Sequence, residues 1–127
     1  MSHVFLIFLG GGLGSVARWG LSSGIQTLAK NTSLKQFPIG ILTCNVLGCF
    51  LIGCLFGYLT SKTTPTWVIP LLATGFLGGF TTFSTFAKDT HSLWENGLTH
   101  LAFLKIILSV VLSVAAVFIG IKLTQSA

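Results

Sequence analysis

No residue between Ile39 and Leu59 carries a charge. As an α-helix this segment is about 31 Å long, which matches the hydrocarbon core of a bilayer. Three more apolar segments, at about residues 4–28, 67–94 and 98–123, are also long enough to span a membrane. The 127 residues include only 7 Lys and Arg and 2 Asp and Glu, too few to cover a water-soluble domain. The sequence therefore predicts one all-α membrane domain, residues 1–127, with four transmembrane helices.

A run of glycines and threonines, residues 74–82, lies in the middle of the third segment. Such a run forms a poor continuous helix, and irregular backbone persists in a bilayer only where protein or a polar cavity surrounds it. We therefore predict that this helix is broken near residues 75–82. The alternative is that the glycines form a packing face for a neighbouring helix.

Basic residues are distributed almost evenly over the two predicted sides of the membrane. Lys30, Lys35 and Lys88 fall on one side, and Lys62 and Lys122 fall on the other. Because an excess of Lys and Arg in the loops normally sets orientation, this chain has little preference. We therefore expect an antiparallel, dual-topology homodimer. Close helix contacts in such a dimer need small residues spaced four apart, which are Gly10, Gly14, Gly53 and Gly57.

Two groups of uncharged side chains inside the spans are candidates for a functional site. Asn45 carries a buried amide that must hydrogen-bond to another helix or to a passing solute. Phe83 and Phe86 share a helical face just after the predicted break. Their ring edges are electropositive and can favour a small anion, although simple aromatic packing is the alternative.

Charged and polar residues in the spans favour an anion pathway. Lys105, Ser109 and Ser113 recur every four residues, so they form a polar track about 12 Å long on one helical face. Arg18 and Lys105 each cost about 2.5–3.5 kcal/mol at the centre of a span, so we expect both to face a vestibule or to snorkel.

The uncharged part of the third segment ends at about residue 87, and the only two carboxylates, Asp89 and Glu95, follow it in the stretch that links to the fourth segment. A proton-coupled exporter of organic cations needs a carboxylate in the middle of a span, so this class is disfavoured. No catalytic motif and no basic cluster for nucleic acid is present in the sequence. We therefore expect neither an enzyme nor a nucleic-acid-binding protein.

Three strings of residues resemble those of one known family. They are GGLGSVARW at residues 11–19, TCNVLG at residues 43–48 and, most specifically, GFLGGFTTFSTF at residues 75–86. By these strings, in this order, the chain resembles the Fluc/CrcB family of fluoride channels over nearly its whole length. The resemblance implies a dual-topology homodimer with two pores that pass fluoride passively and reject chloride. It further implies a location in the cell inner (plasma) membrane, where the channel lowers fluoride toxicity.

The resemblance also assigns roles to individual residues. It implies a structural Na⁺ at the dimer interface, held by the backbone carbonyl oxygens of Gly78 and Thr81 from both subunits. Arg18 and Lys105 would shape the vestibule, and Lys105 stands where relatives often carry a neutral aromatic residue. The implied fluoride path comprises Asn45, Thr82, Phe83, Ser84, Phe86, Ser109 and Ser113. The alternatives are a small multidrug-type cation exporter and a structural membrane subunit, in which the polar side chains only join helices.

Overall fold

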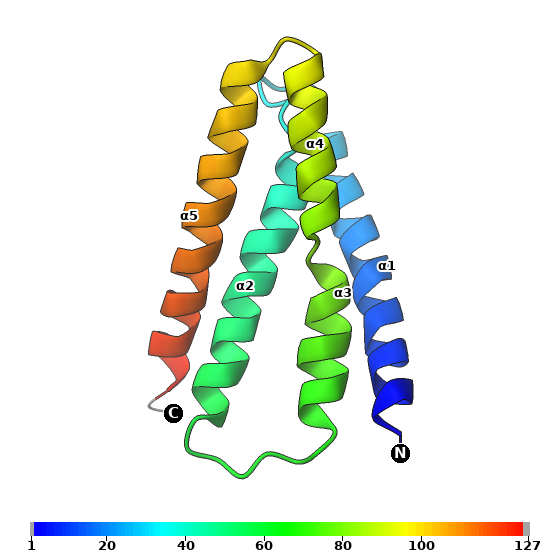
Figure 1. The fold of residues 1–127 in the computed structure, drawn as a ribbon, viewed down its shortest axis with the longest axis vertical. Coiled ribbons are helices and arrows are strands. Elements are labelled where there is room, and N and C mark those ends of the chain that lie inside the picture. Colours follow the sequence, from blue (N-terminus) through cyan, green and yellow to red (C-terminus); the bar gives the residue numbers. More distant parts are fainter. Residues whose placement is uncertain (1, 126–127) are drawn as a thin grey trace.

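The computed structural model describes residues 2–125, and every regular element in that range is helical (Figure 1). Four stretches are long and apolar enough to cross a membrane, the third being formed by three successive elements. The prediction of an all-α membrane fold with four spans is therefore confirmed. The elements are α1 (His3–Ala29), α2 (Ile39–Leu59), the π-helix η1 (Ile69–Leu77), α3 (Gly78–Phe80), α4 (Phe83–Glu95) and α5 (Thr99–Thr124).

The start of α2 is held by a side chain from α1. The Gln26 amide donates from Nε2 to the carbonyl oxygen of Phe37 at 3.0 Å and accepts at Oε1 from the Gly40 N–H at 3.1 Å. Two backbone groups at the helix entrance, one of them an N–H without a partner inside the helix, are thereby satisfied. This contact fixes α1 and α2 beside each other at the end of the bundle that holds the 30–38 connection (Figure 1).

Glycines bring the helices together within the subunit. A Cβ atom on Gly10 would collide with the carbonyl oxygen of Leu71, and one on Gly14 with that of Phe76, so α1 lies directly on η1. In the same way Gly53 of α2 lies on the carbonyl oxygen of Val117 in α5. The expectation that these glycines serve contacts between subunits was therefore wrong. Their small size is already used where the subunit's own backbones approach most closely.

The third span is broken, but over a shorter stretch than residues 75–82. Helical backbone continues to Phe80, and only Thr81 (φ −96°, ψ 156°) and Thr82 (φ −153°, ψ 128°) are extended (Figure 1). Gly75 and Gly79 stay helical because they face α1, where a Cβ on Gly79 would meet the carbonyl oxygen of Gly11. The glycines thus form a packing face, and the break follows them.

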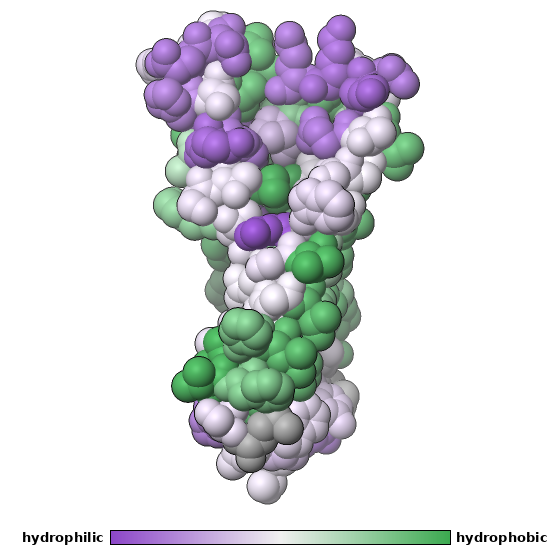
Figure 2. Space-filling view, turned by 90° about the vertical axis from the view of Figure 1, so that its right-hand side faces the viewer, coloured by the Kyte–Doolittle hydropathy of each residue, from purple (hydrophilic) through white to green (hydrophobic). Residues whose placement is uncertain are grey.

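Hydrophilic residues gather at one end of the subunit, and apolar residues dominate the band below it (Figure 2). Asp89 and Glu95 lie on α4 rather than in a link, because α4 continues to Glu95 before the turn at Gly97 (φ 76°). Large apolar side chains remain exposed along the helices, such as Phe8 at 79% and Phe118 at 68%. An apolar surface of this extent suits lipid and a partner subunit rather than water.

Candidate functional site

A pocket of about 260 Å³ lies where the broken span meets α2 and α5. It gathers most of the residues that the sequence marked as a candidate path, drawn from three different spans. Two of its residues, Cys49 and Val110, were not anticipated, although Cys49 lies one helical turn after Asn45. The lining consists of Asn45, Cys49, Thr81, Thr82, Phe83, Phe86, Ser109, Val110 and Ser113.

Asn45 bridges α2 to the break. Its Nδ2 donates to the carbonyl oxygen of Thr82 at 3.0 Å, and its Oδ1 accepts from the Thr82 N–H at 2.8 Å. The side-chain amide therefore satisfies a backbone unit that the helix no longer pairs. Because an amide carries two N–H donors, one remains for the pocket.

Hydroxyl groups surround the first turn of α4. Thr82 caps this helix, since its Oγ1 accepts from the Thr85 N–H at 3.2 Å. The hydroxyl of Ser84 lies 3.2 Å from the same oxygen, and that of Thr85 lies 3.4 Å from it. Ser84 is exposed and does not line the 260 Å³ pocket, so it reaches the site only through Thr82.

The side chains around Thr82 leave two backbone carbonyl groups without their usual helical donors. Gly78 would normally accept from the Thr82 N–H, which is bound to Asn45 instead. Thr81 would normally accept from the Thr85 N–H, which is bound to the Thr82 hydroxyl instead. Backbone carbonyl oxygens with free lone pairs are donors of the kind that suits a hard cation.

The rings of Phe83 and Phe86 form a pair, with centroids 5.3 Å apart and planes tilted by 43°. Phe86 is half-buried between α4 and α5, whereas Phe83 is 78% exposed and extends beyond the subunit. Both rings therefore line the pocket, but Phe86 lies on its inner side and Phe83 reaches the outer surface of the subunit.

The position of Lys105 contradicts our expectation that its side chain snorkels or faces an open vestibule. Its side chain is 0% exposed, and its Nζ lies 5.5 Å from the centroid of the Phe86 ring. The reason is the rotation of α5, which turns Lys105 into the contact with α4. Neither Lys105 nor the half-buried Arg18 lines the 260 Å³ pocket.

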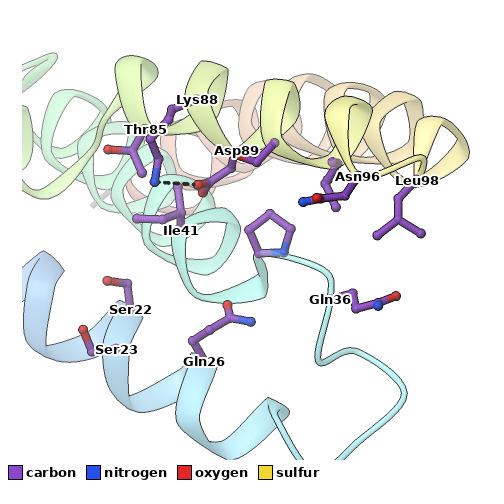
Figure 3. Close-up of a pocket in the computed structure, with 13 residues that line it drawn as sticks. Ser22, Ser23, Gln26, Gln36, Ile41, Thr85, Lys88, Asp89, Asn96 and Leu98 are labelled. Atoms are coloured by element: carbon purple, nitrogen blue, oxygen red, sulfur yellow. Dashed lines mark ion pairs between the residues drawn. The ribbon is translucent and has the colours of Figure 1, made fainter.

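A larger cavity of about 660 Å³ opens between α1, α2 and α4 (Figure 3). Ser22, Ser23 and Gln26 project into it from α1, opposite the ion pair of Lys88 and Asp89 on α4, whose Nζ and Oδ1 are 3.4 Å apart. Thr85 lines this cavity and Thr82 lines the smaller pocket, so the first turn of α4 separates the two.

Fold and site together define a multi-pass membrane protein with a hydroxyl-, amide- and ring-lined pocket at a broken helix. The chain belongs to the CrcB-like protein family (CrcB-like protein, Camphor Resistance (CrcB)), which it matches over residues 5–121. This match confirms the resemblance noted from the three sequence strings.

Curated relatives match nearly the full chain. A Paracoccus denitrificans protein is 45% identical over 122 residues, covering 95% of this chain and 94% of the relative. A Parabacteroides distasonis protein is 42% identical over 126 residues, covering 99% and 95%. A Francisella philomiragia protein is 39% identical over 122 residues, covering 92% and 90%. Each of the three is named a fluoride-specific ion channel FluC.

Proposed function

We propose that this protein is a passive, fluoride-selective ion channel of the cell inner (plasma) membrane that lets fluoride leave the cytoplasm and so lowers its toxicity. One observation carries the proposal: amide, hydroxyl and ring groups from three spans converge on one pocket. Full-length relatives with the printed name fluoride-specific ion channel support the same assignment.

The chemistry of the pocket suits a small, strongly hydrated anion. Asn45 offers an amide N–H, Ser109 and Ser113 offer hydroxyl groups, and the two phenylalanines offer electropositive ring edges. Such groups can replace lost water at the wall of the pocket, whose lining residues carry no charged side chain. Hydrogen fluoride enters a cell uncharged and dissociates at neutral pH, so membrane potential and gradient together drive the anion outward.

The active form that we propose is an antiparallel homodimer with two pores. Phe83 is mostly exposed on the single subunit, and Gly78 beside the break is exposed as well, so both lie on a surface that a second copy can cover. The unpaired carbonyl groups of Gly78 and Thr81 fit a Na⁺ ion shared with the same atoms of the partner. Such an ion would supply positive charge that fixes the two breaks against each other.

The rival function, export of an organic cation, requires a carboxylate at the transport site. Asp89 is engaged by Lys88 in the 660 Å³ cavity, and the 260 Å³ pocket contains no carboxylate among its lining residues. The geometry thus favours an anion over a cation.

The test is anion efflux from liposomes. Purified protein in vesicles loaded with potassium fluoride should release fluoride when valinomycin lets potassium leave, whereas vesicles loaded with potassium chloride should retain chloride. Equal release of both anions would contradict selectivity, and no release of either would contradict a channel. A deletion strain sensitive to fluoride and not rescued by this gene would instead favour a structural subunit.

A further inference from the structure

Two buried hydrogen-bond donors on α5 have no acceptor in the described part of the protein. They are the Nζ of Lys105, whose side chain is 0% exposed, and the Oγ of Ser109, which is 8% exposed as a residue. The two residues are one turn apart on the same face of α5, with a rise of about 6 Å between them. A buried polar group without a partner is costly, and a buried ammonium is far more so.

No carboxylate of the described residues lies within ion-pair distance of Lys105, although the charge of Asp89 acts on it from farther away. Asp89 Oδ1 lies 3.4 Å from Lys88 Nζ, and Glu95 Oε1 lies 3.7 Å from His91 Nε2, so each acidic side chain of the chain has a closer partner. The ammonium lies over the face of the Phe86 ring, with Nζ 5.5 Å from the ring centroid. A ring face attracts a cation but leaves the N–H donors of the ammonium unpaired.

These unpaired donors lie beside the proposed path. Ser109 lines the 260 Å³ pocket. Phe86 lines the same pocket, and the Lys105 ammonium lies over the face of its ring. An ammonium with three donors and a hydroxyl with one make a site whose missing component is an acceptor with negative charge.

We propose that Lys105 and Ser109 form an anion-binding site at the end of the polar track, and that its occupant is the permeating fluoride ion. The inference rests on the proposed channel function and adds a specific role: Lys105 sets the affinity of the path for fluoride. Lys105 acts on the anion by charge, and Ser109 by a hydroxyl contact within the pocket. A path with this charge beside it fills at a lower fluoride concentration than the same path without the charge.

The experiment compares fluoride flux as a function of fluoride concentration in liposomes for the wild type, Lys105→Met and Lys105→Arg. Lys105→Met removes the charge while keeping an unbranched side chain that packs in a core. We expect its half-saturating concentration to rise by about tenfold, because the loss of a unit charge beside the pocket weakens the attraction for an anion. Lys105→Arg keeps the charge and should stay close to the wild type.

Lys122→Met is the matched control, because Lys122 lies on the same helix and is exposed in its last turn. It should leave the half-saturating concentration unchanged. Ser109→Ala should raise that concentration as well, by a smaller factor, since one hydroxyl contact is weaker than a charge. Should Lys105→Met fail to fold, Lys105→Gln tests the same loss of charge.

The outcomes separate this inference from the proposed function. A wild type that passes no fluoride would contradict the channel itself. If the wild type conducts and Lys105→Met or Lys105→Gln has the wild-type half-saturating concentration, the anion site is contradicted. The channel function is unaffected by that result.

Discussion

The side chain of Asn45 pairs with both backbone groups of Thr82, donating to its carbonyl oxygen at 3.0 Å and accepting from its N–H at 2.8 Å. A residue of α2 thereby takes the place of the helical partners that the third span has lost. The break is therefore held open by the neighbouring helix and not by glycine flexibility.

Replacing Asn45 by alanine should destabilise the protein, because it leaves the Thr82 N–H and C=O groups unpaired in an apolar environment. Each unsatisfied buried group costs about 1–3 kcal/mol. We expect a clearly lower melting temperature in detergent. Thr43→Val in the same helix is the control, since the Thr43 hydroxyl bonds only to Ile39 of its own helix at 2.8 Å. Equal melting temperatures for the two variants would show that the bridge contributes nothing.

Gly14→Ala should destabilise the subunit by about 1–3 kcal/mol through overpacking, because the added methyl group collides with the carbonyl oxygen of Phe76. Gly12→Ala in the same helix meets nothing within 4 Å and should be neutral or slightly stabilising. Thermal unfolding followed by circular dichroism measures the difference. Similar unfolding curves for both variants would mean that α1 and η1 do not approach as closely as described.

Phe86→Leu should lower fluoride efflux by about tenfold, equivalent to about 1.4 kcal/mol in the barrier, since a leucine offers no electropositive ring edge. The protein should still fold, because both residues are apolar. Phe8→Leu on the exposed side of α1 is the control and should conduct as the wild type does. Normal efflux through Phe86→Leu would remove the ring from the path.

Sodium should stabilise the assembled protein if the carbonyl groups of Gly78 and Thr81 bind it. At 100 times its dissociation constant, an ion that binds only the folded state adds about 2.7 kcal/mol. We therefore expect a higher melting temperature in sodium chloride than in choline chloride of the same concentration. Identical melting in the two salts would contradict the sodium site.

The number and composition of the spans follow from the sequence, but side-chain orientation does not. Ile39–Leu59 is identified by length and lack of charge alone, and α2 has the same bounds. The burial of Lys105 could not be predicted, because it depends on the rotation of α5 against α4, which many contacts determine together. Likewise Gly79 and Thr81 look equally unsuited to a helix, and only packing on α1 keeps the former helical.

The position of Asn45 ahead of the break along the chain has a consequence for biosynthesis. The third span is the least apolar of the four, and its extended residues Thr81 and Thr82 are poorly suited to enter lipid on their own. Since α2 is translated first, the amide that pairs with Thr82 is already in the membrane when the third span leaves the ribosome. The parts of the third span before and after Thr81 and Thr82 therefore enter the bilayer when Asn45 of α2 is already there to pair with Thr82. A circular permutant translated from the third span onward would lose this order.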